Sequence, residues 1–188
     1  MLRQLPNLLT GLRLVLVPPI LWLLVAGDYA WALGLAVVAG VSDWLDGALA
    51  RRFGGILDPL ADKLLLVGTY VVLGVLGHLP VWLVALVVLR DVIIVAGAAV
   101  YHFRFEAVQP EPTRLSKVNT VAQLLLMMVT LVELAGLPVK DPILYVLIAA
   151  VGVLVVATLV QYVGIWSARA ARIAREREAP DGNGRRSR

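Results

Sequence analysis

The stretch SDWLDGALARRFGGILDPLADKLLL, residues 42–66, contains four aspartates, Asp43, Asp46, Asp58 and Asp62, within a strongly apolar part of the chain. A charge at the centre of a bilayer costs roughly 2.5–3.5 kcal/mol on insertion scales, so four carboxylates are not expected there by chance. The segment RRFGG separates the first pair from the second. The stretch therefore predicts two helices joined by a tight connector, with a polar site between them.

The composition of the whole chain is typical of a membrane protein. Of its 188 residues, 60% are hydrophobic and 16% are charged, and the mean hydropathy is +0.86. A soluble domain of this size cannot bury so much apolar surface, so we expect an integral membrane protein in contact with the lipid bilayer. The sequence has no cysteine, which excludes disulfides and thiolate chemistry. The net charge of +4 does not indicate nucleic-acid binding, because the basic residues cluster near the ends of apolar segments.

Six apolar segments are each close to the roughly 20 residues that a helix needs to cross the hydrocarbon core. Turn-forming sequences, among them AGDYA, GHLP and GLPVKDP, separate these segments. We therefore predict an all-α integral membrane protein with six transmembrane helices. The predicted helices cover residues 8–26, 31–50, 57–76, 81–101, 118–135 and 143–166.

The positions of Lys and Arg predict the orientation of these helices. If the N-terminus is inside, the outer loops carry only Lys140. The inner segments then carry Arg3, Arg51, Arg52, Arg104, Arg114 and Lys117, followed by the arginines of the C-terminal tail. Because cytoplasmic loops are enriched in basic residues, we expect both termini in the cytoplasm of a multi-pass protein of the cell (inner) membrane. We divide the chain into a six-helix membrane domain, 1–166, and a basic tail, 167–188, which is first helical and then disordered.

The spacing of the four aspartates predicts that they converge. Asp43 and Asp46 are three residues apart, and Asp58 and Asp62 are four apart, so each pair shares one face of its helix. In an antiparallel pair of helices, residues at equal depth have a constant sum of residue numbers. That sum is almost the same for Asp43 with Asp62 as for Asp46 with Asp58. Asp58 before Pro59 is also a simple helix start. The matched depth of all four nevertheless favours one site facing the cytoplasm.

Four converging carboxylates repel one another unless some are protonated or cations lie among them. Oxygen ligands without His or Cys favour Mg²⁺, Mn²⁺ or Ca²⁺ over zinc. Two such ions bridged by carboxylates are typical of phosphoryl-transfer sites. Gly47 and Ala50 leave the helix surface beside the carboxylates open to a ligand, and Arg51 lies where it suits a phosphate.

These residues resemble the signature of the CDP-alcohol phosphatidyltransferases, D-x2-D-G-x2-A-R…G-x3-D-x3-D. The matching residues are Asp43, Asp46, Gly47, Ala50, Arg51, Gly54, Asp58 and Asp62. The N-terminal PNLLTGLRLVLVP is similar to the opening helix of that family, with Asn7, Thr10 and Arg13 as its polar members. The family has a six-helix membrane core, which agrees with the predicted helices.

The resemblance implies an enzyme that transfers a phosphatidyl group from CDP-diacylglycerol to an acceptor hydroxyl and releases CMP. It implies two divalent ions, Mg²⁺ or Mn²⁺, held by the four aspartates, and Asp62 as the general base. It also implies a homodimer. The residues expected to contact CDP are Asn7, Thr10, Asp46, Gly47, Ala50, Arg51 and Gly54.

The chain departs from the family pattern at its connector, where only Arg52 and Phe53 separate Arg51 from Gly54 and the family has a longer spacer. The shortening removes about one turn from each helix and keeps the two pairs at matched depth. We therefore expect a competent site with a thinner cytoplasmic rim over the nucleotide.

Further charges lie inside the apolar segments, and we expect them to face the same polar cavity as the aspartates. They are Arg13, Lys63, Arg90 and Asp91. The cations expected to bind the acceptor are Arg90, Arg114 and Lys117, although Arg90 also fits a structural pair with Asp91 and Arg114 also fits a membrane anchor. The sequences RDV and SKVNT resemble the cardiolipin synthases of the family, which favours phosphatidylglycerol as the acceptor, with glycerol 3-phosphate second.

Two alternatives explain embedded carboxylates differently. A cation-coupled transporter also needs them, but all four aspartates fall near the cytoplasmic side of one helix pair instead of at the midplane between repeats. A catalytically inactive member of the family is the second alternative, because of the short connector.

Overall fold

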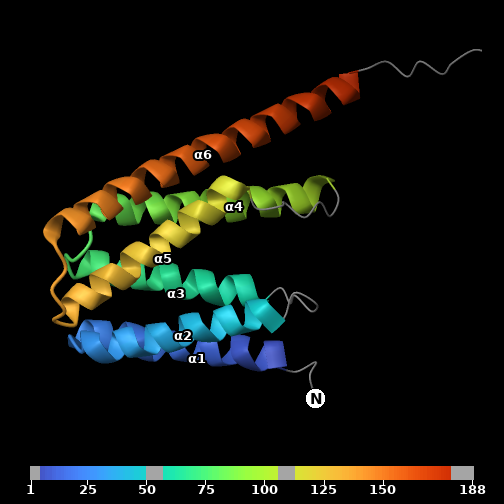
Figure 1. Cartoon of the computed structure of the whole chain (residues 1–188). Helices are drawn as coiled ribbons and strands as arrows, with labels where there is room; N and C mark the ends of the chain where they lie inside the picture. The colour runs from blue at the N-terminus through green and yellow to red at the C-terminus, as the bar shows by residue number, and fades with distance from the viewer. Residues whose placement is uncertain (1–4, 50–56, 106–112, 179–188) are drawn as a thin grey trace, which may run out of the picture.

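The computed structural model describes residues 5–49, 57–105 and 113–178, with side chains described mainly over 14–42, 63–97 and 113–165. Within these ranges every regular element is a helix, which confirms the all-α prediction (Figure 1). The helices begin and end within four residues of their predicted bounds, and the last one continues beyond residue 166 into the part of the tail that was predicted to be helical. The helices are α1 (Leu5–Ala26), α2 (Tyr29–Leu49), α3 (Leu57–Val75), α4 (Val81–Phe105), α5 (Arg114–Leu134) and α6 (Asp141–Glu178).

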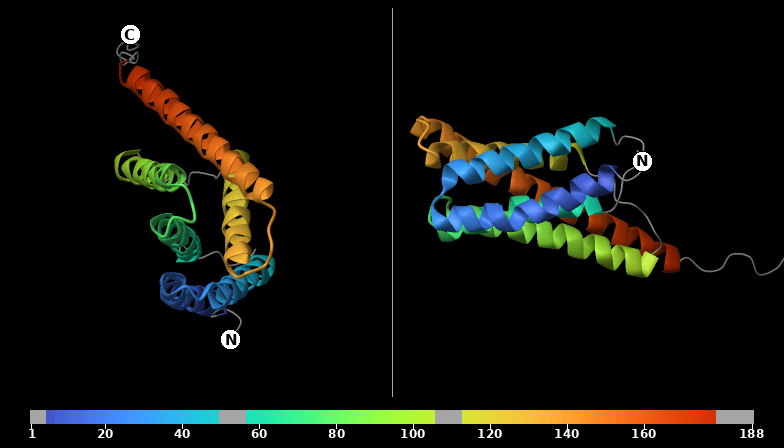
Figure 2. Two further views of the ribbon diagram at one scale, coloured as in Figure 1. Left: turned by 90° about the vertical axis from the view of Figure 1, so that its left-hand side faces the viewer. Right: turned by 90° about the horizontal axis from the view of Figure 1, so that it is seen from below.

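Successive helices run in alternating directions and form an elongated bundle (Figures 1 and 2). The turns between α1 and α2, α3 and α4, and α5 and α6 share one end, here called the turn end. The starts of α1, α3 and α5 lie at the opposite end, here called the cavity end. Helix α1 packs against α2 and α3, α5 packs against α2, α3 and α6, and α4 packs against α3 and α6.

The predicted pair of α2 and α3 is antiparallel, but within the described residues the two helices are not packed directly against each other. Helices α1 and α5 instead contact both of them, so that α2 and α3 face one another across the bundle (Figure 2). A reason is visible on α2, whose residues Ala36, Ala39 and Gly40 line a cavity on this side. These side chains are too short to fill the space between the helices.

The turn end is closed by three helix C-terminal caps of the same kind. Gly27, Gly77 and Gly136 have positive φ angles of 83°, 80° and 88°, a conformation that glycine adopts without steric cost. In each cap the next residue donates its backbone N–H to a carbonyl five residues earlier, as in Asp28 to Leu23 at 2.9 Å. This is the Schellman arrangement, and it satisfies carbonyls that the helix end would leave unpaired.

Close packing of α3 against α4 near the turn end depends on Gly74. A Cβ atom at this position would lie 2.7 Å from Cγ2 of Val84, closer than real Cβ contacts allow. The adjoining core is apolar and tightly buried, because Leu73, Leu79 and Leu83 are each at most 2% exposed. The turn end is therefore the well-packed part of the bundle.

The outside of the bundle is strongly apolar while several polar side chains are buried. Large apolar residues such as Trp31, Val75 and Tyr145 are 72%, 82% and 72% exposed, an arrangement suited to lipid. Within the described residues, two helical segments, Arg114–Leu134 and Asp141–Ile165, are long and apolar enough to cross a membrane. Shorter apolar segments occur in three of the other helices, at Leu14–Ala26, Tyr29–Ser42 and Lys63–Val75.

Candidate functional site

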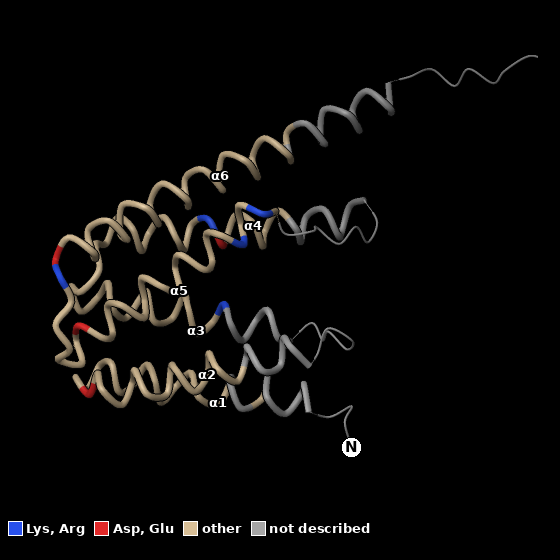
Figure 3. Tube along the Cα trace, viewed as in Figure 1, with Lys and Arg blue, Asp and Glu red and all other residues tan. Residues whose placement is uncertain are grey.

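The described charged residues gather at two levels of the bundle, with an uncharged length between them (Figure 3). One level is the turn end. The other lies toward the cavity end and includes Lys63 on α3 with Arg90 and Asp91 on α4. The second level is the unusual one, because Arg90 is only 2% exposed and Asp91 only 7% exposed.

An ion cluster joins α3, α4 and α5 at this level. Arg90 Nη1 donates to Asp91 Oδ1 at 2.5 Å, and Arg90 Nη2 donates to the Ser116 hydroxyl at 2.7 Å. The Lys63 ammonium lies 3.7 Å from the same Asp91 oxygen. A buried carboxylate needs such partners, since removing one partner of a buried pair leaves an uncompensated charge. Asp91 of α4 is therefore linked through Lys63 to α3, the helix whose first turns include Asp58 and Asp62.

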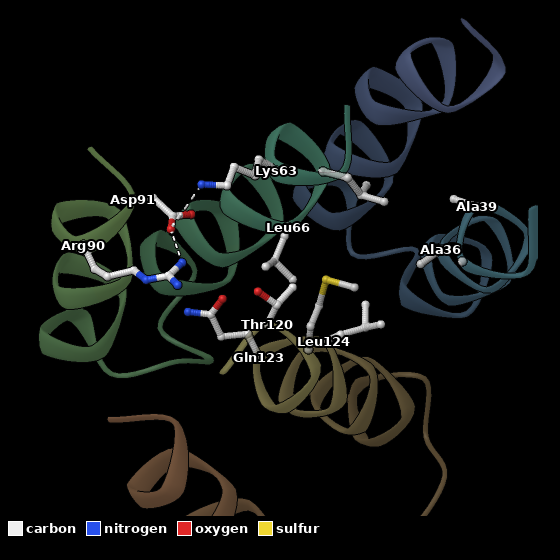
Figure 4. Close-up of a pocket in the computed structure, with 12 residues that line it drawn as sticks. Ala36, Ala39, Lys63, Leu66, Arg90, Asp91, Thr120, Gln123 and Leu124 are labelled. Carbon is white, nitrogen blue, oxygen red and sulfur yellow. Dashed lines mark hydrogen bonds and ion pairs between the residues drawn. The ribbon is translucent and has the colours of Figure 1, made fainter. Parts of the chain in front are cut away.

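A cavity of about 170 Å³ lies beside this cluster, between α2, α3, α4 and α5 (Figure 4). Its charged and polar wall comes from α3, α4 and α5, and its small residues come from α2. The lining residues are Ala36, Ala39, Gly40, Lys63, Leu65, Leu66, Arg90, Asp91, Thr120, Gln123, Leu124 and Met127. Lys63, Arg90 and Asp91 thus line one cavity, and the sharing of that cavity with the four aspartates stays a prediction.

Several polar atoms at this level are buried without a hydrogen-bond partner among the described residues. They include both amide atoms of Gln123, both amide atoms of Asn119 and Nε of Arg90. Gln123 and Asn119 are completely buried, but only Gln123 lines the cavity. Unpaired buried polar groups are rare in native structures, so each one calls for a structural or functional cause.

The backbone at Gln123 is held by α3. The Tyr70 hydroxyl, itself fully buried, donates to the main-chain carbonyl of Gln123 at 2.9 Å. This bond fixes the register of α5 against α3 while leaving the Gln123 amide free to face the cavity. In Figure 4 the Gln123 side chain extends from α5 toward the side of the cavity from which Arg90 projects.

The predicted nucleotide and metal residues lie largely outside the described residues. Ala50, Arg51 and Gly54 are not described at all. The others belong to described helices but their side chains are not described: Asn7 and Thr10 in α1, Asp43, Asp46 and Gly47 in α2, and Asp58 and Asp62 in α3. Their proposed roles stay predictions. Where side chains are described, no three His, Cys, Asp or Glu residues are grouped as metal ligands would be.

The three predicted acceptor cations occupy different positions. Arg90 lines the cavity and is paired with Asp91, so the structural interpretation is observed and the acceptor role stays a prediction. Arg114 and Lys117 are exposed on the first turn of α5 and are not part of the cavity wall. The structure thus brings only Arg90 of the three to the cavity, and the acceptor roles of all three stay predictions.

The polar residues of α5 were not identified as site residues from the sequence. Ser116, Thr120 and Gln123 follow one another at spacings of four and three residues, which places them on one helix face. In a helix apolar enough to cross a membrane, such a polar face indicates a cavity or a polar neighbour. This spacing within SKVNTVAQ was the signal that could have located them.

Comparison with known proteins adds a family and several relatives. The model of the family described as CDP-alcohol phosphatidyltransferase matches residues 3–163. "Probable cardiolipin synthase (CMP-forming)" of Drosophila melanogaster is 40% identical over 141 residues, which cover 63% of this chain and 44% of that protein. "Cardiolipin synthase (CMP-forming)" of Homo sapiens is 34% identical over 148 residues, covering 67% and 49%.

The name of a third relative includes glycerol 3-phosphate. "CDP-diacylglycerol--glycerol-3-phosphate 3-phosphatidyltransferase 1, chloroplastic" of Oryza sativa subsp. japonica is 37% identical over 153 residues, covering 69% of this chain and 46% of that protein. The chain spans about half the length of the curated relatives it matches.

Proposed function

We propose that this chain, which belongs to the CDP-alcohol phosphatidyltransferase family, transfers a phosphatidyl group from CDP-diacylglycerol to a glycerol-type acceptor in phospholipid biosynthesis. The acceptor is phosphatidylglycerol or glycerol 3-phosphate, and CMP is released. The observation that carries the proposal is the family match over residues 3–163, which includes the complete aspartate motif from Asp43 to Asp62. The transporter alternative has no comparable support.

The proposed reaction is one displacement at phosphorus. The acceptor hydroxyl oxygen forms a bond to the phosphorus that carries diacylglycerol, and the bond from that phosphorus to the bridging oxygen of CMP breaks. Asp62 accepts the hydroxyl proton as general base, and CMP leaves with the bridging oxygen. The nucleotide would lie against Asp46, Gly47, Ala50, Arg51 and Gly54, near Asn7 and Thr10.

The four aspartates have the chemistry of ligands for two Mg²⁺ or Mn²⁺ ions. Their oxygen-only donor set suits hard divalent cations, and their helices α2 and α3 are antiparallel, so the end of α2 and the start of α3 lie at the same end of the bundle. When bound, such ions neutralise the charge of the diphosphate and of the transition state. Asp43, Asp46, Asp58 and Asp62 are the residues that would hold them.

The cavity supports a site at this position. Gly40 and Ala39 of the cavity wall precede Asp43 by three and four residues, which is helical spacing for one face of α2. Leu66 of the wall follows Asp62 by four residues on α3. The spacing therefore predicts that the aspartates lie on the cavity-lining faces, one turn nearer the cavity end.

We further propose that all six helices cross the cell (inner) membrane, with both termini and the aspartates on the cytoplasmic side. The exposed apolar side chains around the bundle and the distribution of Lys and Arg support this topology. We also propose a homodimer, which rests on the family alone.

The test is an assay of the purified full chain with CDP-diacylglycerol, Mg²⁺ and each acceptor, in which CMP and the lipid product are measured. CMP formation should depend on an acceptor and stop when EDTA removes the metal. Because general-base catalysis contributes about 10²–10⁴-fold, Asp62→Asn should lower kcat by at least about 100-fold. A folded sample that releases no CMP with either acceptor would contradict the proposal and favour the inactive scaffold. Ion flux in liposomes without CMP would favour the transporter.

A further inference from the structure

The side-chain amide of Gln123 is placed to bind a ligand in the cavity. It is completely buried and lines the cavity, and neither its nitrogen nor its oxygen has a partner among the described residues. Leaving such a group unpaired is destabilising, and an apolar side chain of similar size would avoid that cost. The cavity of about 170 Å³ has roughly ten times the volume that one water needs, so it has room for a larger group.

The charges of the described cavity wall favour a ligand with a single negative charge. Lys63 and Arg90 supply two positive charges and Asp91 one negative charge. Nε of Arg90 has no described partner, and the described ion pair of the Lys63 ammonium is the 3.7 Å contact with Asp91. A phosphodiester carries one negative charge, whereas a phosphomonoester carries about 1.5–2 near neutral pH. The wall therefore matches a phosphodiester better than a phosphomonoester.

The rest of the cavity wall is apolar and reaches the surface of the bundle. Its members include Leu65, Leu66 and Met127, which are buried, and Leu124, which is 44% exposed. A lipid acceptor presents carbon-rich groups to such a wall and extends its acyl chains outward. A small water-soluble phosphate ester has no comparable group to cover these side chains.

Taking the proposed function as the basis, we propose that this cavity binds the headgroup of a phosphodiester lipid acceptor whose head is a glycerol. The phosphodiester lies against Lys63 and Arg90, and the Gln123 amide hydrogen-bonds the secondary hydroxyl of the glycerol. An amide both donates and accepts, as a hydroxyl does, so one side chain satisfies both functions of that group. The terminal hydroxyl remains free to attack the phosphorus of CDP-diacylglycerol. Gln123 is thus a specificity-determining residue.

The position of Gln123 relative to the start of α3 constrains how the headgroup lies in the cavity. Lys63 follows Asp62 directly in the chain, so the phosphodiester site adjoins the start of α3 where the proposed base lies. The Tyr70 hydroxyl holds the backbone of Gln123 against the same helix. Lys63 lies nearer the start of α3 than Tyr70 does, so the phosphodiester is the part of the headgroup nearer Asp62, and the glycerol folds back from Gln123 to bring its terminal hydroxyl to the base.

The experiment compares two lipid acceptors that differ in one hydroxyl. Phosphatidylglycerol and phosphatidyl-1,3-propanediol, which lacks the secondary hydroxyl, are each presented in mixed micelles with CDP-diacylglycerol and Mg²⁺. A site built to hydrogen-bond a hydroxyl rejects the analogue without it strongly, so the wild-type kcat/KM should favour phosphatidylglycerol by at least about 100-fold. Gln123→Leu should lower kcat/KM for phosphatidylglycerol by a similar factor and change that for the analogue little, which brings the ratio near one.

Asn119→Leu is the matched control. Asn119 is another fully buried and unpaired amide on α5, but it does not line the cavity, so its replacement should leave the acceptor ratio at the wild-type value. Gln123→Met, which also lacks the hydrogen bonds, serves as a second variant if Gln123→Leu does not fold. Thermal unfolding in detergent reports the folding of each variant.

The outcomes separate this inference from the proposed function. An acceptor ratio that stays high in both Gln123 variants, or a wild-type enzyme that does not distinguish the two lipids, overturns the inference. Transfer to glycerol 3-phosphate but not to phosphatidylglycerol also overturns it, while the phosphatidyltransferase activity stands. Absence of CMP release with every acceptor overturns the proposed function and this inference together.

Discussion

The two ends of the bundle are built on opposite principles. At the turn end, three helices finish in the same glycine cap and the core residues Leu73, Leu79 and Leu83 are almost fully buried. At the cavity end, Arg90 and Asp91 are buried together and the amide of Gln123 has no described partner. Buried polar groups of this kind lower stability unless they are paired. The turn end therefore holds the helices together, so that the cavity end can keep charges, polar groups and empty space.

The largest effect on stability is expected at the ion cluster of the cavity end. Asp91→Ala removes the carboxylate that faces both Arg90 and Lys63, and it leaves the Arg90 charge buried without its partner. Breaking a buried pair in this way costs about 3–5 kcal/mol of unfolding free energy. The loss should appear in chemical or thermal unfolding of the purified protein in detergent.

A control variant and a double variant test this prediction further. Glu133→Ala removes a carboxylate from the turn end of α5, and its effect should stay within about 0.5 kcal/mol. The double variant Arg90→Met with Asp91→Leu replaces the pair with apolar side chains, and it should be clearly more stable than Asp91→Ala alone. A double variant as unstable as the single one would show that the charges themselves hold the cavity end together.

A smaller effect is expected from packing at the turn end. Gly74→Ala places a Cβ atom 2.7 Å from Val84, and overpacking of a tight core costs about 1–3 kcal/mol. Gly34→Ala is the matched helix glycine, since a Cβ atom there has no neighbour within 4 Å. It should raise stability by about 0.5–1 kcal/mol, because alanine is the better helix former. Equal melting temperatures for the two variants would show that the turn end is not tightly packed.

The smallest effect is expected at the surface of the turn end. The Tyr29 hydroxyl lies 3.0 Å from Nε2 of His78 and joins the start of α2 to the turn between α3 and α4. Tyr29→Phe removes this exposed bond, so unfolding free energy should fall by no more than about 1 kcal/mol. Tyr145→Phe, at a tyrosine that is 72% exposed and has no described bond, should change nothing measurable. A decrease in unfolding free energy above about 2 kcal/mol for Tyr29→Phe would contradict this expectation and show that the bond contributes strongly to the stability of the turn end.

Most helix boundaries could be predicted from the sequence, because the length of each apolar segment and the glycine and proline residues between segments decide them. The first helix ends at Ala26 before Gly27 and the fourth begins at Val81 after Pro80, as predicted. The start of α5 was predicted at residue 118 but lies at Arg114. Hydropathy alone does not identify the polar first turn of this helix. The helix begins there because Thr113 caps it by accepting the N–H of Ser116 at 3.2 Å.

The neighbours of each helix did not follow from the sequence in the same way. A helix in lipid is apolar on most of its surface, so hydrophobic periodicity does not say which helix it contacts. The packing of α5 against both α2 and α3 was therefore not predicted, nor was the position of Gln123 in the cavity wall. The ion pair of Arg90 and Asp91 was named as an alternative, because two embedded opposite charges in one helix suggest it.

Under the proposed role of Gln123 in selecting the acceptor, the bond between Tyr70 and residue 123 bears on how acceptor choice changes during evolution or design. Tyr70 donates to the main-chain carbonyl of residue 123, so the tie between α3 and α5 does not depend on which side chain that residue carries. A substitution at this position alters the chemistry of the cavity wall while the register of the two helices is retained. Residue 123 is thus a point at which a new headgroup preference could be selected, or introduced by an engineer, without rebuilding the scaffold.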